Sequence, residues 1–364
     1  MLYGIALLKW DRKYGLRVEA SYPDSLEMDD QIIKQVYTNH EFEEEAGFLS
    51  ISISELNIAS YYTGTSDYYF VALLSIDEIP EDYEDILTDT VRLVMANIKG
   101  RRYREDLPFY FQNIQTYPNM SKEQKLSLIL LDPIMKMIID RLIEDGTVTK
   151  SELSAWLKDK FGQEYIDLDS IINSLLRNKI LREETLEEMT SSSIFLIGDI
   201  FVSRIPPKSS ILFVKGMKSL EPKVTKNYFD DVSTFFEKYS PNPEDQEEIL
   251  RIITNMDCYQ LISRLRTAPL SQNSKIYAKI YAGMKDFNSV LKRLWDAQII
   301  SVLKDKKGVE QLFLRSDIAV RYVFPEYLIN KIRSVYHEGS KAENILIEYL
   351  RILQDRYYDF KKSR

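Results

Sequence analysis

Basic and amide side chains gather in the last third of the chain, at a spacing that suits contact with phosphate groups. A predicted helix over residues 285–297 carries five of them on or near its polar face: Lys285, Asn288, Ser289, Lys292 and Arg293. The turn that follows adds three more: Lys304, Lys306 and Lys307. Side chains of these types contact nucleic-acid phosphates and base edges. Two interpretations stand: a contact with DNA or another acidic partner, and an ordinary solvated surface.

Four tyrosines flank a predicted hairpin nearer the N-terminus: Tyr61, Tyr62, Tyr68 and Tyr69. Tyrosine has a high propensity for strands, so cross-strand packing on a half-exposed sheet accounts for them. The alternative is an aromatic anchor surface for a protein partner, because tyrosines are enriched among the residues that dominate binding energy.

Residues for catalysis or metal binding are scarce. The two histidines, His40 and His337, fall in different predicted domains, and Cys258 is the only cysteine, which excludes a zinc site built from His or Cys. Neither a Gly-x-x-x-x-Gly-Lys-Ser/Thr phosphate loop nor a Gly-x-Ser-x-Gly nucleophile motif occurs. The acidic run from Asp77 to Asp85 is interpreted as a solvated helix start rather than a cation site. We therefore predict no enzymatic activity and no cofactor.

The composition is that of a globular protein with several domains. The 364 residues are 45% hydrophobic and 29% charged, and this length predicts two to four domains. Residues 1–110 carry 10 basic against 21 acidic side chains, whereas residues 207–364 carry 27 against 20. Either the C-terminal third meets an acidic partner while the N-terminal domain repels nucleic acid, or the asymmetry is drift on solvated faces.

No apolar run approaches the roughly 20 residues that a membrane-spanning helix needs. Residues 1–8 are apolar, but the run is short, lacks a basic leader and ends at Lys9, which favours a first strand over a signal peptide. The single cysteine fits a reducing compartment. These features predict a cytoplasmic protein without an integral membrane segment.

The helix that carries the basic face belongs to a twelve-residue pattern that occurs twice. Residues 170–181 and 289–300 both have apolar side chains at their second, third, sixth, seventh, eleventh and twelfth positions. The spacing predicts an amphipathic helix that leads directly into a strand.

Each copy lies in a module that resembles a winged helix: helices followed by a hairpin. The first module is predicted over 121–206 and the second over 243–325. The second module resembles the winged helix of archaeal and bacterial regulators over about 80 residues. The first module offers few cations on its third helix and carries an acidic wing, so we predict that it binds protein. Its face and wing residues are Asp167, Asp169, Asn173, Ser174, Arg177, Glu183, Glu184, Glu187 and Glu188.

The N-terminal region predicts strands and helices in the order β-β-α-β-β-β-α. The opening strand contains Gly4-Ile-Ala-Leu-Leu8, Gly15 sits in the first turn, and a long helix begins near Pro80. This order resembles a longin domain, a fold related to roadblock domains, over residues 1–100 of a predicted domain 1–110. The resemblance implies a non-catalytic platform that dimerises or binds small GTPases, SNARE-type segments or coat subunits.

The remaining segments are a predicted linker with a helix over 207–242 and C-terminal helices over 326–364. Pro206–Pro222 is interpreted as a hinge. The final helix has apolar residues at helical spacing from Ala342 to Tyr357. It either caps the second module or pairs with its copy in a homodimer.

The predicted fold class is α+β: a longin-like domain, two winged-helix domains and a C-terminal helix. The leading functional hypothesis is an adaptor of archaeal character whose partner is a protein, with a small GTPase or a trafficking-type assembly implied by the longin resemblance. The tandem winged helices also resemble those of ESCRT-II subunits at the level of fold. The alternative is a transcription-associated regulator that binds DNA through the second winged helix.

Overall fold

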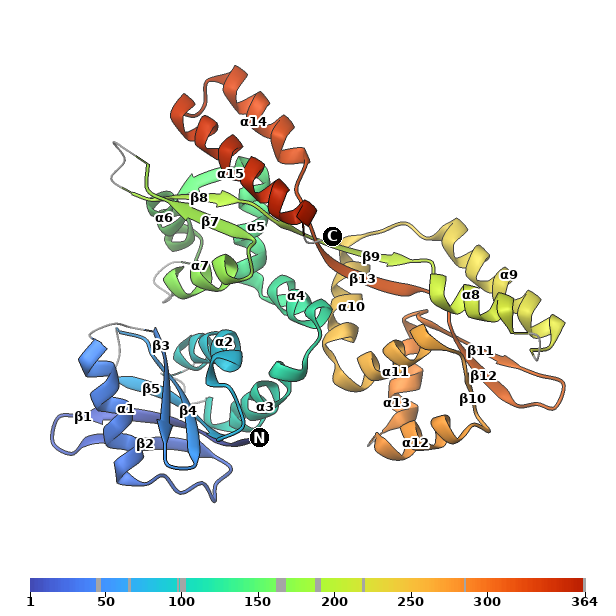
Figure 1. Ribbon diagram of the computed structural model, residues 1–364, viewed down its shortest axis with the longest axis horizontal. Coiled ribbons are helices and arrows are strands. Elements are labelled where there is room, and N and C mark those ends of the chain that lie inside the picture. Colours follow the sequence, from blue (N-terminus) through green and yellow to red (C-terminus); the bar gives the residue numbers. More distant parts are fainter. Residues whose placement is uncertain are drawn as a thin grey trace. The chain divides into compact units, whose positions relative to one another are not determined.

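The computed structural model describes residues 1–43, 47–64, 67–96, 98, 103–161, 168–186, 191–217, 220–284 and 286–362. Helices are mixed with small antiparallel sheets (Figure 1), so the protein is of the α+β class. Its residues form two compact units, and neither unit is a continuous stretch of chain. Unit 1 comprises Met1–Met120, Asp145–Ile197 and Glu338–Arg351; unit 2 comprises Ser121–Glu144, Gly198–His337 and Ile352–Arg364.

Unit 1 begins with a five-stranded antiparallel sheet in the order β2-β1-β5-β4-β3. Its strands are β1 (Leu2–Asp11), β2 (Gly15–Tyr22), β3 (Gly47–Ile53), β4 (Leu56–Tyr62) and β5 (Tyr68–Ser75). In the centre, Leu7 pairs with Phe70 and Ala59 pairs with Ala72. The central strands are apolar on both sides because both faces of the sheet are covered. The five strands agree with the predicted ones, and Gly15 has the expected positive φ of 74°.

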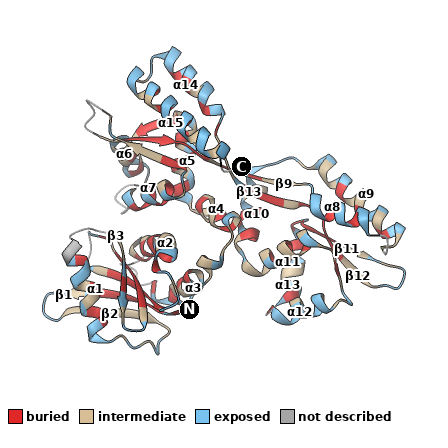
Figure 2. Ribbon diagram, viewed as in Figure 1, coloured by how far each residue is buried: buried red, intermediate tan, exposed pale blue. Residues whose placement is uncertain are grey.

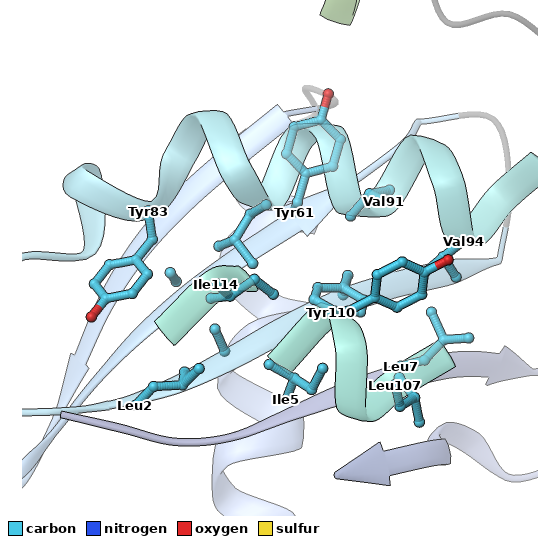
Figure 3. Close-up of a cluster of buried hydrophobic side chains, with 14 of the residues drawn as sticks. Leu2, Ile5, Leu7, Tyr61, Tyr83, Val91, Val94, Leu107, Tyr110 and Ile114 are labelled. Atoms are coloured by element: carbon cyan, nitrogen blue, oxygen red, sulfur yellow. The ribbon is translucent and has the colours of Figure 1, made fainter. Parts of the chain in front are cut away.

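Helices cover both faces of this sheet. Alternate residues of β1 point to opposite faces, so Ile5 and Leu7 join one buried cluster while Ala6 and Leu8 join the other. Helix α1 (Asp30–Glu43) packs in the second cluster. The first cluster lies under α2 (Glu84–Ala96), which follows the 3₁₀ turn η1 (Pro80–Tyr83), and under α3 (Tyr103–Thr116), as Figure 3 shows.

Helix α3 is not among the predicted helices, and it extends the N-terminal core past residue 110. Leu107, Tyr110 and Ile114 are all buried against the sheet. Pro108 lies inside the helix near its beginning, which is an unfavourable sequence cue. The 3₁₀ turn η2 (Tyr117–Asn119) follows it.

The first module has, in chain order, one helix, a strand, two helices and two strands. These are α5 (Pro133–Asp145), β6 (Thr147–Thr149), α6 (Lys150–Phe161), α7 (Leu168–Arg177), β7 (Leu181–Glu184) and β8 (Ser193–Leu196). The strands form an antiparallel sheet in the order β6-β8-β7. The returning strand of this sheet, β8, ends at Leu196.

The second module repeats this order in unit 2. After α10 (Pro243–Thr254) its elements are α11 (Met256–Thr267), β10 (Leu270–Ser271), α12 (Lys275–Gly283), α13 (Phe287–Asp296), β11 (Ile300–Lys304) and β12 (Glu310–Leu314). The sheet order β10-β12-β11 corresponds to that of the first module. Figure 2 shows α12 largely exposed, and no residue of α12 is buried.

The two copies of the repeat end their helices in the same way. The tenth residue of each copy, Lys179 or Gln298, adopts a left-handed conformation with φ of 57° or 56°. The amide of the next residue donates to the carbonyl five residues back, at 3.0 Å in the first copy and 2.9 Å in the second. This is the Schellman type of helix C-cap. It turns the chain sharply, so that the apolar pair at positions eleven and twelve begins the strand.

A long-range strand pair encloses the second module. Strand β9 (Asp199–Ile205) pairs in antiparallel fashion with β13 (Asp317–Val323). The predicted hinge contains helix α8 (Lys208–Gly216), which is followed by α9 (Pro222–Lys238). The remaining helices are α4 (Lys122–Leu131), α14 (Tyr327–Glu338) and α15 (Glu343–Lys362).

The beginning of the last helix, α15, packs on the sheet of the first module. The Tyr349 ring lies 5.1 Å from the ring of Phe195, and its hydroxyl donates to the Leu196 carbonyl at 2.8 Å. Neither predicted role of this helix, capping the second module or pairing in a dimer, includes this contact.

We expect Gly198→Ala to destabilise unit 2. A Cβ atom at residue 198 would lie 1.8 Å from the hydroxyl oxygen of Tyr322 and 2.2 Å from its Cζ. The Tyr322 ring is held in place because Arg356 donates to its hydroxyl at 3.3 Å. Overpacking of this kind costs about 1–3 kcal/mol.

The matched control is Gly283→Ala at the end of α12, where nothing lies within 4 Å of the added Cβ. It should be neutral or stabilise by about 0.5–1 kcal/mol. Labelling of the buried Cys258 thiol during urea unfolding measures both, because this is the sole cysteine and it lies in unit 2. Equal urea midpoints for the two variants would contradict the expectation.

Candidate interaction surfaces

Helix α13 exposes the predicted polar face. Phe287 and Leu294 of this helix are buried. The described residues of the predicted polar face are exposed. These are Asn288, Ser289, Lys292 and Arg293; Lys285 lies outside the described residues. The Asp286 carboxylate accepts the Ser289 amide at 2.9 Å and caps the helix.

Acidic side chains lie close to the cations of this face. Arg293 and Arg251 line an open cavity of about 280 Å³ together with Glu244, Glu247 and Glu248. The Arg293 guanidinium donates to the Arg251 carbonyl at 3.3 Å. A DNA phosphate approaching Arg293 would therefore meet carboxylates on the neighbouring helix α10.

The hairpin of β11 and β12, which was predicted as the wing of the second module, carries three lysines. Two of these three wing lysines are paired with carboxylates. Lys304 Nζ lies 3.3 Å from Glu310 Oε1, and Lys306 Nζ lies 2.7 Å from Glu221 Oε1. The hydrogen bond from the Lys306 side chain holds the pKa of Glu221 below its ordinary value. Lys307 is exposed and has no ion-pair partner among the residues that the structure describes. The wing therefore offers less free positive charge than its sequence implies.

The wing, α8 and α9 form one packed tip. Their shared core contains Val214 of α8, Val224 and Tyr228 of α9, and Phe313 of β12. The Tyr228 hydroxyl donates to the Leu314 carbonyl at 2.9 Å. This tip was not predicted, although the apolar run 211–214 between lysines was visible in the sequence.

A buried arginine joins several elements of unit 2. Arg204 on β9 is 6% exposed and donates to Asp245 through Nη2 at 2.6 Å and through Nε at 2.9 Å. Its Nη1 donates to the Ala297 carbonyl at 2.7 Å and to Ser316 Oγ at 3.1 Å. The Tyr239 hydroxyl donates to Asp245 at 2.9 Å.

These residues border a cavity of about 480 Å³, whose wall also contains a second pair, Arg315 and Asp231, at 2.8 Å. These four charged groups bond within their own two pairs, while Lys238, Glu248 and Asp296 also line the wall. We interpret the two pairs as a structural junction that joins β9, α9 and α10 to the second module.

The four tyrosines do not form one surface. Tyr61 and Tyr68 belong to the cluster under α2 and α3, whereas Tyr62 and Tyr69 belong to the cluster under α1. Tyr61 and Tyr69 are buried, and the other two are half-buried. The Tyr62 and Tyr69 rings stack with their centroids 4.5 Å apart. Strand alternation places neighbours such as Tyr61 and Tyr62 on opposite faces, so packing accounts for the set better than a single anchor surface.

A buried histidine completes the second of these clusters. His40 is 2% exposed, and its Nε2 lies 2.9 Å from the Ser60 hydroxyl. Its Nδ1 has no hydrogen-bond partner among the described residues. Burial lowers the pKa of His40 from 6.5 to about 4, so the ring is neutral at pH 7.

The third helix of the first module, α7, uses its polar side chains within unit 1. Arg177 binds Glu84 at 2.8 Å and Asp85 at 2.7 Å, and Asp169 binds Lys150 at 2.6 Å. Ser174 is buried, so it does not belong to the predicted exposed face, where Asn173 remains. In the wing, Glu183 lies 3.5 Å from Lys150 and Glu184 lies 2.6 Å from Arg182. Asp167, Glu187 and Glu188 lie outside the described residues.

Within the described ranges, no three or more His, Cys, Asp or Glu side chains gather in a way that would hold a metal ion. None of the helices in those ranges has both the length and the apolar character that crossing a bilayer requires.

No protein-family model matches the chain, and a search of curated proteins finds no significant match.

Proposed function

We propose that this protein is a non-catalytic adaptor with a longin-like N-terminal domain and two winged-helix modules. The observation that carries the proposal is the sheet order β2-β1-β5-β4-β3, with α1 on one face and with α2 and α3 on the other. The order of these elements along the chain supports the resemblance to a longin domain. Longin-like domains act as platforms for other proteins, which makes a protein the expected partner.

The two repeated modules support the adaptor proposal, because each module can supply a separate binding surface. Both have the order helix, strand, helix, helix, strand, strand, and both end the third helix with the same left-handed cap. Arg177 of α7 pairs with Glu84 and Asp85 inside unit 1, so it is not free to bind a DNA phosphate, which is consistent with a module that does not read DNA. The partner class that we propose for the platform is a small GTPase.

The edge strands of the N-terminal sheet are the part of the platform best suited to a partner. Among the strands that the structure describes, β2 and β3 each pair on one side only, so each offers an edge on which an added strand could pair, although the Glu19 carbonyl of β2 already accepts from Arg104. Val18 on β2 is 41% exposed, so a substitution there changes the edge without disturbing the core.

The full-length protein should bind at least one small GTPase from a purified panel, each member loaded with GDP or with a non-hydrolysable GTP analogue. Val18→Asp should weaken that binding by at least about tenfold, because it places a charge on the edge where the partner docks. Biolayer interferometry measures both. The control is Ile329→Asp on α14, a residue that is 49% exposed and lies in unit 2. An empty panel, or equal loss in both variants, would count against a GTPase platform.

DNA binding by the second module is the competing function, and the exposed Lys292 and Lys307 favour it. The ion pairs of Lys304 and Lys306 and the glutamates beside Arg293 oppose it. We expect no binding to random duplex DNA at about 50 mM salt. Micromolar, strongly salt-dependent binding that disappears when Lys292, Arg293, Lys304 and Lys307 become glutamate would establish the DNA-binding function instead.

A further inference from the structure

The tip formed by α8, α9 and the wing exposes large apolar side chains. Leu212 is 60% exposed, Phe213 is 40% exposed and Met217 is 37% exposed. They continue into an open, largely apolar groove of about 560 Å³, whose walls include Met217, Leu220 and Phe229. Exposed apolar groups concentrated in one short segment mark an interaction site more often than isolated ones do.

Lysines surround these apolar side chains. Residues 207–230 contain five lysines and two acidic residues, Glu221 and Asp230, and Asp230 lies in the wall of the groove. The lysines on the described part of this segment are exposed: Lys208, Lys215, Lys223 and Lys226. Glu221 pairs with Lys306 of the β11–β12 hairpin, so it does not offset the charge of these four lysines. The segment therefore combines protruding apolar groups with positive charge.

Helix α8 is anchored by buried contacts on its inner side. Val214, on the inner face of α8, is buried against α9 and the wing. The hydroxyl of Ser210 donates to the Leu265 carbonyl at 2.9 Å in a buried contact with α11. Leu212 and Phe213 project from the opposite side of a helix that is anchored on its inner side.

We propose that this tip docks on an anionic lipid membrane, with Leu212, Phe213 and Met217 inserted at the headgroup level and the lysines against acidic headgroups. Apolar side chains that enter the acyl boundary, together with lysines that meet negative charge, are the two elements of peripheral membrane binding. Charge complementarity selects this occupant over a neutral apolar partner. The inference concerns a different surface and partner from those of the adaptor proposal, and either stands without the other.

The test is co-sedimentation of the full-length protein with vesicles of phosphatidylcholine containing about 30% phosphatidylserine, compared with pure phosphatidylcholine. We expect binding to the anionic vesicles only, with affinity that falls as salt rises. Leu212→Asp/Phe213→Asp should lower the affinity at least about tenfold. Because each lysine near an anionic surface contributes about fivefold, Lys215→Ala/Lys223→Ala/Lys226→Ala should lower it by about a hundredfold.

Helix α12 supplies matched controls, because Ile276 and Tyr281 are 46% and 49% exposed and stand beside Lys275 and Lys279. Ile276→Asp/Tyr281→Asp and Lys275→Ala/Lys279→Ala/Lys292→Ala should leave vesicle binding unchanged. All the substituted side chains are exposed, and Cys258 labelling verifies that unit 2 stays folded.

Three results would overturn the proposal: no binding to anionic vesicles at low salt, equal binding to neutral vesicles, or loss of binding only in the α12 variants. If the tip instead binds an acidic amphipathic peptide and no vesicle, the membrane proposal is wrong and the surface is a protein-binding one. The GTPase panel remains interpretable in each case, because it does not involve the tip.

Discussion

Replacing Arg204 by methionine should destabilise unit 2 by about 3–5 kcal/mol. The variant removes the Arg204 donors that hold the Asp245 carboxylate and leaves that charge largely buried, with the Tyr239 hydroxyl as its remaining side-chain donor among the described residues. It also leaves the Ala297 carbonyl without this donor. An unpaired buried charge lowers the free energy of unfolding far more than the loss of a surface ion pair does. We therefore expect a large loss of stability in Arg204→Met.

The surface pair Arg251–Glu247 provides the control. Its ion pair is as short as that of Arg204, at 2.6 Å, but its side chains are 63% and 60% exposed. Arg251→Met should therefore cost less than about 1 kcal/mol. Both variants are compared by the urea midpoint for labelling of Cys258, which follows unit 2 without interference from unit 1.

A double variant distinguishes the buried charge from general damage to packing. Arg204→Met/Asp245→Leu removes both charges, and it should recover a large part of the lost stability because no buried ion remains unpaired. If the double variant is as unstable as the sum of its single variants, the electrostatic explanation is wrong.

The N-terminal domain should lose about 3 kcal/mol of stability as the pH falls from about 6.5 to about 4, through His40 alone. The pKa of His40 is about 4 in the folded protein, against 6.5 for an ordinary histidine, because burial opposes the charged ring. Between these pH values the unfolded chain binds a proton that the folded chain does not. The stabilisation is therefore complete above about pH 6.5 and disappears as the pH falls through the folded pKa.

His40→Gln isolates this contribution, because glutamine does not titrate and retains an amide that can bond to Ser60. The rings facing His40 are those of Tyr62 and Tyr69. Urea unfolding is measured at several pH values in a background where Trp10, one of the three tryptophans, is the only one retained. The free energy of unfolding should fall more steeply toward pH 4 in the protein with His40 than in the His40→Gln variant. If the two proteins show parallel pH dependence, the effect does not come from His40.

Local patterns predicted most of the elements. The strands of the N-terminal sheet and both copies of the helix–strand repeat follow from periodicity and turn residues, which act over a few positions. Helix α3 was not predicted because Pro108 is an unfavourable residue near its beginning. Its apolar side chains are explained only by their packing against the sheet. The pairing of β9 with β13 joins residues more than a hundred positions apart, and nothing in either segment specifies its partner.

In the candidate surfaces, too, local patterns were predicted from the sequence and long-range contacts were not. The exposed face of α13 follows from helical spacing, so the described residues of the predicted set are indeed exposed. Sequence alone did not show that Glu221 pairs with Lys306, because that contact depends on how α9 meets the wing. For the same reason the burial of Arg204 was not foreseen, since Arg204 lies on strand β9 and its partner Asp245 lies on helix α10.

The ladder of β9 and β13 has a mechanical consequence. Its antiparallel register pairs Asp199 with Val323 at one end and Ile205 with Asp317 at the other. Tension applied through residues 198 and 324 acts at a single end and along the direction of the interstrand hydrogen bonds, so these bonds break one after another at low force. Residues 206–316 carry no load until the last pair has separated, which shields the second module from stretching of the flanking chain.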